Sequence, residues 1–226
     1  MKDRVPVNRP EAVVFDFDGT LVDSYEAIAA SVNHVRSSHG LPLLSTAEVR
    51  RHVGRGPIHL LRRTVPNSDI AIDLAKYRTH HPSVLRSGTH LLPGVAKTLR
   101  ELKDAGFRLG ICSNKPAAFT RQLVKILGLT GLVDAVVGPE DAPRIKPAPD
   151  MLLAILSRLA VVPTQALYVG DMVVDVETAR SAGVTVWVIP TGSDSKETLA
   201  KASADRLLGD FSEIAALLIG GSTAQG

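Results

Sequence analysis

Short apolar runs alternate with amphipathic stretches through most of this chain, and each pattern predicts a different kind of element. Short runs rich in β-branched residues are typical of buried strands in a parallel sheet. The predicted strands cover residues 12–15, 107–112, 132–137, 166–169, 184–189 and, at an edge, 205–208. Helical spacing of apolar residues predicts helices over residues 93–106, 116–128, 150–160, 176–183 and 211–218. Such alternation implies right-handed crossovers and an α/β fold with a doubly wound, Rossmann-like parallel sheet.

The stretch from residue 21 to residue 90 follows a different pattern, because it has no strong strand run and helical spacing dominates. The apolar positions on this spacing are Tyr25, Ile28, Val32 and Val35, followed by Ile58, Leu60, Leu61 and Val65. We therefore expect a catalytic core formed by residues 1–20 and 91–226, with residues 21–90 inserted as a helical unit. The small and polar residues 220–226 predict a frayed C-terminal end.

Polar side chains follow several of the predicted strands at the point where each strand ends. Asp16 and Asp18 close the first run, and residues two apart lie on the same side of a strand. Two carboxylates in one small site need a cation or a proton to compensate their charge. Ser113, Lys146 and Asp171 follow later runs. Because ligands of parallel sheets bind at the carboxyl ends of the strands, we expect these groups to meet there.

These residues occur in an order that resembles the signature of the haloacid dehalogenase superfamily. The matching pieces are Asp16-Phe17-Asp18-Gly19-Thr20, then Ser113, then Lys146, then Gly170-Asp171 with Asp175 four residues further on. The resemblance covers about residues 11–210, and DFDGTLVDS and KPAPD are most similar to the phosphoglycolate phosphatase branch. It implies hydrolysis of a small phosphate monoester, with phosphoglycolate as the first candidate, through an aspartyl-phosphate. It also identifies residues 21–90 as the helical cap of this superfamily.

The resemblance also implies a role for each site residue. Asp16 would be the nucleophile, and Asp18 would protonate the leaving alcohol and then activate water. Ser113 and the backbone N–H of Asn114 would hold phosphoryl oxygens, and Lys146 would bridge the phosphate and Asp16. The bond after Lys146 is expected to be cis, since the trans preference of an X–Pro bond is only about 0.5–1 kcal/mol.

The expected cofactor is Mg²⁺, a hard cation that prefers oxygen ligands and phosphate. By resemblance, its ligands are a carboxylate oxygen of Asp16, the backbone carbonyl of Asp18 and the carboxylate of Asp171. Asp175 is expected to accept hydrogen bonds from metal-bound waters rather than to bind the metal directly. Relatives usually carry serine after the aspartate at 171, whereas this chain has Met172, so a small change in metal geometry is expected.

Composition limits the partners of the protein. Its 226 residues carry a formal charge of only +3, and 4% of them are aromatic, so nucleic acid is not an expected partner. The chain has a single cysteine, Cys112, expected to be buried, and neither a secretory signal nor an apolar run that could span a membrane. We therefore expect a cytoplasmic enzyme whose partner is a small anionic phosphoester. The sequence gives no indication of the oligomeric state.

The predicted cap is more basic than the core, with nine Lys and Arg against five Asp and Glu and all seven histidines. A cationic lid would suit an anionic substrate, and we expect it to close on hinges at Thr20–Val22 and Ser87–Pro93. Within it, Val53-Gly54-Arg55-Gly56 resembles the specificity stretch of phosphoglycolate phosphatases. Arg55 is the candidate reader of a substrate carboxylate, while a solvent-facing turn is the plain alternative. A mutase of the β-phosphoglucomutase type, or a broad sugar-phosphate or pyrophosphate phosphatase, is the alternative function.

Overall fold

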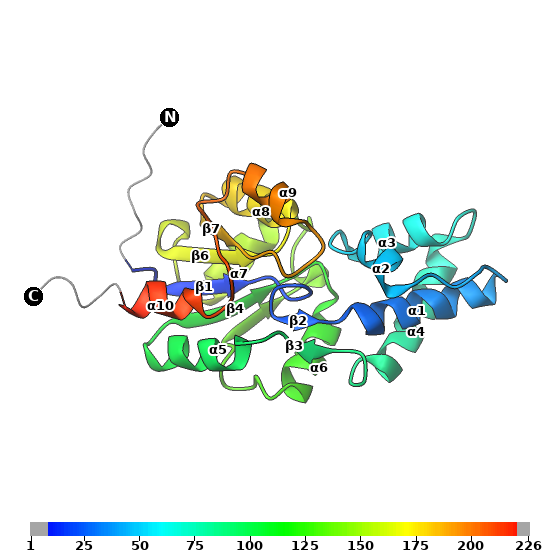
Figure 1. Cartoon of the computed structure of the whole chain (residues 1–226), viewed down its shortest axis with the longest axis horizontal. Coiled ribbons are helices and arrows are strands. Elements are labelled where there is room, and N and C mark those ends of the chain that lie inside the picture. Colours follow the sequence, from blue (N-terminus) through cyan, green and yellow to red (C-terminus); the bar gives the residue numbers. More distant parts are fainter. Residues whose placement is uncertain (1–8, 221–226) are drawn as a thin grey trace, which may run out of the picture.

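The computed structural model describes residues 9–220, and Figure 1 shows it as a sheet domain with a smaller helical unit at one end. The predicted frayed end lies outside the described residues apart from Gly220. The strands are β1 (Ala12–Phe15), β2 (Val22–Asp23), β3 (His90–Leu91), β4 (Arg108–Cys112), β5 (Ala135–Val137), β6 (Ala166–Gly170), β7 (Thr185–Val188) and β8 (Arg206–Leu207). The α-helices are α1 (Tyr25–Ser38), α2 (Thr46–Arg50), α3 (Gly56–Thr64), α4 (Ile70–Val84), α5 (Val95–Asp104), α6 (Ala117–Ile126), α7 (Asp150–Arg158), α8 (Val173–Ala182), α9 (Lys196–Lys201) and α10 (Glu213–Ile219). Two 3₁₀ turns, η1 (Pro139–Asp141) and η2 (Pro163–Gln165), complete the elements.

Six of the described strands form one parallel sheet in the order β5-β4-β1-β6-β7-β8, which confirms the predicted doubly wound fold. The first strand lies between β4 and β6, with Phe15 opposite Ile111 and Val169. The strand predicted over 132–137 begins only at Ala135, because the chain before it is a turn closed by a bridge between Thr130 and Val133. Because β1 lies between β4 and β6 and all three run parallel, their carboxyl ends are neighbours.

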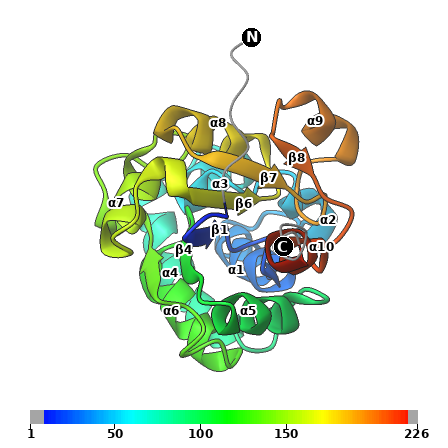
Figure 2. The ribbon, with the colours of Figure 1, turned by 90° about the vertical axis from the view of Figure 1, so that its left-hand side faces the viewer.

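Helices cover both faces of this sheet, and each face has its own apolar cluster. Figure 2 shows α7 and α8 on one side of the strands and α5 and α10 on the other. Alternate residues of β1 divide between the clusters, as the period of a strand requires: Val13 and Phe15 pack towards α5, α6 and α10, whereas Ala12 and Val14 pack towards α7, α8 and α9. Cys112 is fully buried, as predicted.

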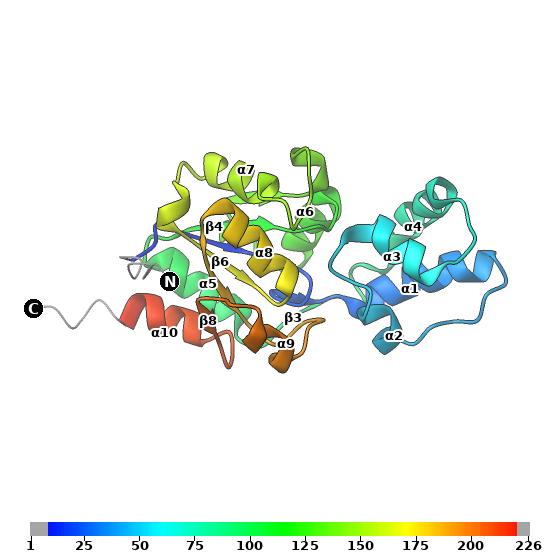
Figure 3. The ribbon, with the colours of Figure 1, turned by 90° about the horizontal axis from the view of Figure 1, so that it is seen from above.

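Helices α1 to α4 pack around a third cluster that includes Ile28, Val32, Leu61 and Tyr77. Figure 3 shows this helical unit beyond the end of the sheet, joined to it by two segments. Those segments pair as the antiparallel strands β2 and β3, so the inserted range is not entirely helical. The longest described helix is α4, with 15 residues, and none of the helices within residues 9–220 is long and apolar enough to cross a bilayer.

The limits of the insertion remain a prediction, because side chains near its ends belong to the sheet domain. Leu21, Val22 and Leu85 lie within the range 21–90 but join the apolar cluster beneath α5. Ile58 was expected to face inwards, yet 44% of it is exposed in the first turn of α3. The inward residues of that helix are Leu60, Leu61 and Thr64, which come later in the helix.

Candidate active site

The turn after β1 carries the paired carboxylates into a buried position. Asp16 is 4% exposed and Phe17 is buried in the sheet domain, so the backbone between the two aspartates is anchored. Gly19 has φ +88°, and a Cβ there would stand 2.6 Å from an oxygen of Asp171. The glycine of the motif is therefore required both by a left-handed conformation and by the close approach of the third carboxylate.

Two neighbouring segments hold the carboxylate of Asp171, which is fully buried at the end of β6. The Thr20 hydroxyl donates to Oδ1 at 2.8 Å, and the Ser193 backbone N–H donates to Oδ2 at 3.2 Å. A Cβ at Gly192 would lie only 1.5 Å from Oδ2. The role of Ser193 was missed from the sequence, although it follows the predicted strand 184–189 and so belongs to the same end of the sheet.

Lys146 reaches Asp16, the predicted nucleophile, from the loop before α7. Its Nζ lies 2.9 Å from Asp16 Oδ1 and 2.7 Å from Asp175 Oδ1, and it donates to the Tyr168 hydroxyl at 3.0 Å. Burial alone would lower the pKa of this lysine, but the charges of Asp16 and Asp175 raise it above its ordinary value, so the ammonium stays charged. The Lys146–Pro147 bond is cis, as predicted.

Protein donors surround the carboxylate of Asp175. Its Oδ1 accepts from Lys146 and Tyr168, and its Oδ2 accepts the backbone N–H groups of Asp171 and Met172 at 3.2 and 3.0 Å. Asp175 therefore fixes both Lys146 and the turn that carries Asp171. Its predicted hydrogen bonds to metal-bound waters stay a prediction.

Asp18 has a partner that the sequence did not reveal. Lys115 Nζ lies 3.1 and 3.3 Å from its two carboxylate oxygens, and the Ser24 hydroxyl donates to Oδ1. Both lysine and aspartate are largely buried, with side chains 4% and 12% exposed. The only signal for Lys115 was its position directly after Ser113 and Asn114, at the end of β4.

Asn114 connects three loops through its side-chain amide. Its Nδ2 donates to the Gly54 carbonyl at 2.9 Å and to the Lys146 carbonyl at 3.2 Å, while its Oδ1 accepts the Lys146 backbone N–H at 3.0 Å. Met172, the residue that departs from the usual pattern, packs on the same cap loop, because a Cβ at Gly54 would meet its sulfur at 2.3 Å. The cap loop 53–56 thus rests on the sheet domain beside the predicted phosphoryl site.

The carboxylates at this end of the sheet fit a divalent cation. One oxygen each of Asp16, Asp171 and Asp175 lie within 4.8 Å of one another. Within residues 9–220, Asp16 Oδ1 is buried without a hydrogen bond of acceptable geometry, although the charge of Lys146 is close. Burial raises the pKa of Asp16 to about 6, which Lys146 only partly opposes, and burial with the neighbouring carboxylates raises the pKa of Asp171 strongly. Buried carboxylates that resist ionisation because they lack enough positive charge nearby would be stabilised by a cation, and their oxygen donors suit Mg²⁺.

A cavity of about 40 Å³ lies between the cap and these carboxylates. Its walls include Asp16, Asp18, Ser113, Asn114 and Lys115 from the sheet domain. The cap contributes Ile28, Val53, Gly54, Gly56, Pro57, Leu60, Tyr77 and His81, which are mostly apolar. Among the described residues, no arginine lines this cavity, and Arg55 is exposed at the start of α3. Arg55 is therefore not among the residues that line this cavity.

This fold and site define an α/β enzyme that gathers carboxylates, a buried lysine and a hydroxyl at one end of a parallel sheet, beneath a helical insertion. The chain belongs to the haloacid dehalogenase-like hydrolase family, which matches residues 13–189. It is 37% identical to a phosphoglycolate phosphatase of Rhodospirillum rubrum, with 91% of this chain and 89% of that protein covered. It is 31% identical to a phosphoglycolate phosphatase of Nitrosococcus oceani, with 94% and 98% covered.

A solved structure shows the same arrangement of elements. The crystal structure of a predicted phosphoglycolate phosphatase from Haemophilus somnus superimposes with a TM-score of 0.87 at 26% sequence identity. That match covers 94% of this chain and 99% of the other.

Proposed function

We propose that this protein is a Mg²⁺-dependent phosphatase that hydrolyses phosphoglycolate through an aspartyl-phosphate at Asp16. The observation that carries the proposal is the contact of a buried nucleophile with Lys146, opposite Asp171 and beneath a small cavity that Asp18 and Ser113 also line. Catalysis of phosphate monoester hydrolysis depends mainly on positioning the reactants and on positive charge, because the anionic oxygens of the ester repel nucleophiles. This site supplies both.

Two steps account for hydrolysis. In the first, an oxygen of Asp16 attacks phosphorus, the bond to the leaving oxygen breaks, and Asp18 gives that oxygen a proton. In the second, Asp18 takes a proton from water as the water attacks phosphorus, and the bond to Asp16 breaks. Lys146 opposes the negative charge on Asp16 and the phosphoryl oxygens, Ser113 donates to those oxygens, and Lys115 with Ser24 keeps Asp18 in place.

The metal would be held by Asp16, the Asp18 backbone carbonyl and Asp171, and would supply positive charge next to the phosphoryl oxygens. Thr20 and Ser193 orient the Asp171 carboxylate for that role, since each donates to one of its oxygens.

Similarity to named relatives supports phosphoglycolate over a hexose phosphate. The relatives from Rhodospirillum rubrum and Nitrosococcus oceani are phosphoglycolate phosphatases, which points to the same substrate. These relatives do not favour the mutase or the broad sugar-phosphate phosphatase, which the sequence left open.

A panel of phosphoesters assayed with and without Mg²⁺ tests the proposal. The expected result is release of phosphate from phosphoglycolate only with Mg²⁺, and much slower release from glucose 6-phosphate and pyrophosphate. The Asp16→Asn variant should be inactive, whereas Asp104→Asn, which changes an exposed aspartate at the end of α5, should retain wild-type activity. Equal rates on all esters, or full activity after chelation, would contradict the proposal.

A further inference from the structure

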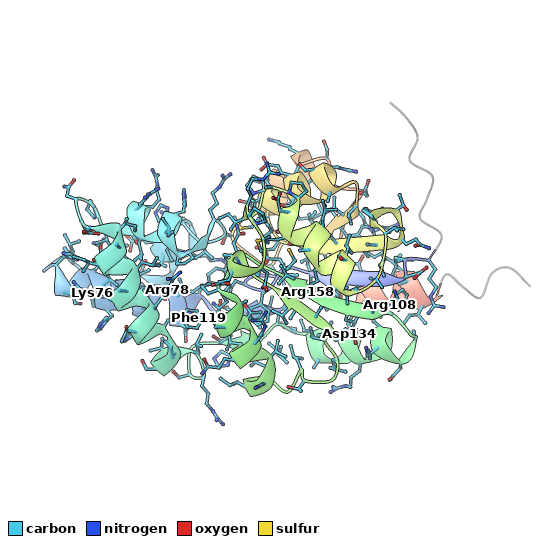
Figure 4. The ribbon with its side chains drawn as sticks, turned by 180° about the vertical axis from the view of Figure 1, so that it is seen from behind. Lys76, Arg78, Arg108, Phe119, Asp134 and Arg158 are labelled. Atoms are coloured by element: carbon cyan, nitrogen blue, oxygen red, sulfur yellow. The ribbon has the colours of Figure 1, made fainter. Side chains whose placement is uncertain are left out.

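The cap side of the cavity carries a buried nitrogen without a partner, on the imidazole of His81 in α4. The side chain is fully buried, and its ring centroid lies 4.9 Å from that of Tyr77, which is stacked on it, and 5.0 Å from that of Phe119 of α6, which is edge-on. Figure 4 shows Phe119 at the junction between the cap and the sheet domain. Within residues 9–220, Nε2 of His81 has no hydrogen-bond partner, and the residue lines the cavity. An unpaired polar atom in this position is unfavourable, so it points to a ligand in the cavity.

The hydrogen bonds of Ser31 determine which ring nitrogen of His81 carries the proton. The Ser31 hydroxyl has one proton, which it donates to the Ala27 carbonyl at 3.0 Å, one turn earlier in α1. Its oxygen therefore accepts from Nδ1 of His81 at 2.8 Å and from Nδ1 of His80 at 3.2 Å. A neutral imidazole with its proton on Nδ1 has a lone pair on Nε2. The cavity wall consequently presents a hydrogen-bond acceptor.

Lys115 places a hydrogen-bond donor at the same cavity. Its ammonium lies 3.1 and 3.3 Å from the two carboxylate oxygens of Asp18, which is the only acceptor of this side chain among the described residues. Because an ammonium has three N–H groups, at least one is left for a ligand. Burial first, and then the charge of Lys115, lowers the pKa of His81 to about 2, so the ring is neutral near pH 7. The same charge would repel a cationic ligand, so the partner of Nε2 should be an uncharged donor.

We propose that Nε2 of His81 and the ammonium of Lys115 bind a hydroxyl group on the leaving alcohol of the substrate. A hydroxyl is both a donor and an acceptor, so its proton goes to Nε2 and its oxygen accepts from Lys115. A carboxylate cannot donate to Nε2, and an alkyl group makes neither contact. The inference rests on the proposed phosphatase function and extends it, by the same two steps at Asp16, to phosphate monoesters of diols and other hydroxylated alcohols. Ser31 is a positioning residue, because it acts only through the tautomer of His81.

The test compares esters of equal length in which a methyl group replaces a terminal hydroxyl. The two pairs are 2-hydroxyethyl with propyl phosphate, and 3-hydroxypropyl with butyl phosphate. The measured quantity is the ratio of kcat/KM values within each pair for wild type, His81→Phe and a matched control, His59→Phe, which changes an exposed histidine on α3. In at least one pair wild type should prefer the hydroxylated ester, and loss of the hydrogen bond predicts a fall in that ratio of about 3- to 10-fold for His81→Phe. His59→Phe should keep the wild-type ratios.

A spectroscopic measurement reports on the ring directly and covers the case in which His81→Phe fails to fold. In the turnover-silenced Asp16→Asn variant with ¹⁵N-labelled histidines, the couplings between ring nitrogens and ring protons should show that His81 is protonated on Nδ1. At least one of the hydroxylated esters should shift the Nε2 signal of His81 to the lower frequency of a hydrogen-bonded nitrogen, and its methyl counterpart should not.

Three results would overturn the hydroxyl site: equal ratios in wild type and His81→Phe, a proton on Nε2, or an Nε2 signal that responds equally to both esters of each pair. Release of phosphate from phosphoglycolate with Mg²⁺, but with no preference for either hydroxylated ester, would leave the phosphatase standing and remove only this site. If wild type releases phosphate from none of these esters with Mg²⁺, the proposed function fails, and the Nε2 signal alone decides whether the hydroxyl site exists.

Discussion

Protonation of His81 offers a prediction that can be checked without any substrate. The groups around the ring are Ser31 and the Ala27 carbonyl from α1, His80 and Tyr77 from α4, and Lys115 and Phe119 from the sheet domain. Because burial lowers the pKa of His81 from 6.5 to about 2, the folded protein leaves the ring neutral where the unfolded chain binds a proton. Stability from this group is therefore full above pH 6.5 and decreases as the pH falls towards the folded value.

The size of the effect follows from the two pKa values. One pKa unit corresponds to about 1.4 kcal/mol, and half of the unfolded chains already carry the proton at pH 6.5. The free energy of unfolding should therefore fall by about 2 kcal/mol between pH 6.5 and pH 4.5 because of His81 alone.

Urea unfolding at pH 6.5, 5.5 and 4.5 measures this contribution. Other groups also titrate in this range, so the useful quantity is the difference between wild type and His81→Phe, in which the contribution is removed. The variant should lose about 2 kcal/mol less than wild type over the same range. The exposed His90 serves as the matched control, and His90→Phe should follow wild type. Equal losses in wild type and His81→Phe would show that the ring is not held neutral.

Three further predictions concern the carboxylate site. Asp16→Asn should abolish turnover without lowering the melting temperature, because it relieves repulsion among buried carboxylates; a large drop in melting temperature would contradict this. Lys146→Met should leave Asp16 and Asp175 without their cation and lower the free energy of unfolding by about 3–5 kcal/mol, so a urea midpoint like that of wild type would contradict the buried ion pairs. Arg50 donates to the carbonyls of Thr191 and Gly192, so Arg50→Ala should loosen the loop that orients Asp171 and raise the Mg²⁺ concentration for half-maximal activity several-fold. An unchanged Mg²⁺ dependence would show that this loop does not affect metal binding.

Local sequence patterns were sufficient for the sheet domain and for the end of the sheet at which the candidate site residues lie. Apolar runs identify strands because both faces of a parallel sheet are buried, and residues that follow such runs must meet at the carboxyl end of the sheet. For this reason the separate motifs around Asp16, Ser113, Lys146 and Asp171 could be assigned to one site from their positions along the chain.

The cap side of the site could not be read in the same way. Helical spacing indicates which face of α3 or α4 is buried, but not whether that face meets another helix or the cavity. Arg55 looked suitable because of its glycine neighbours, yet it is exposed, whereas the sequence did not distinguish His81 from the other histidines of the cap. Lys115 pairs with Asp18 across 97 positions of the sequence, and no local sequence pattern predicts such a contact.

The identity of the phosphorylated residue tests the central claim most directly. Wild-type protein mixed with Mg²⁺ and excess phosphoglycolate, quenched in acid within the first turnovers and digested, should yield an acid-stable phosphopeptide whose phosphate is on Asp16. The Asp16→Asn variant should yield none. Phosphate on another side chain, or rapid hydrolysis with no phosphorylated peptide at any quench time, would contradict the aspartyl-phosphate mechanism.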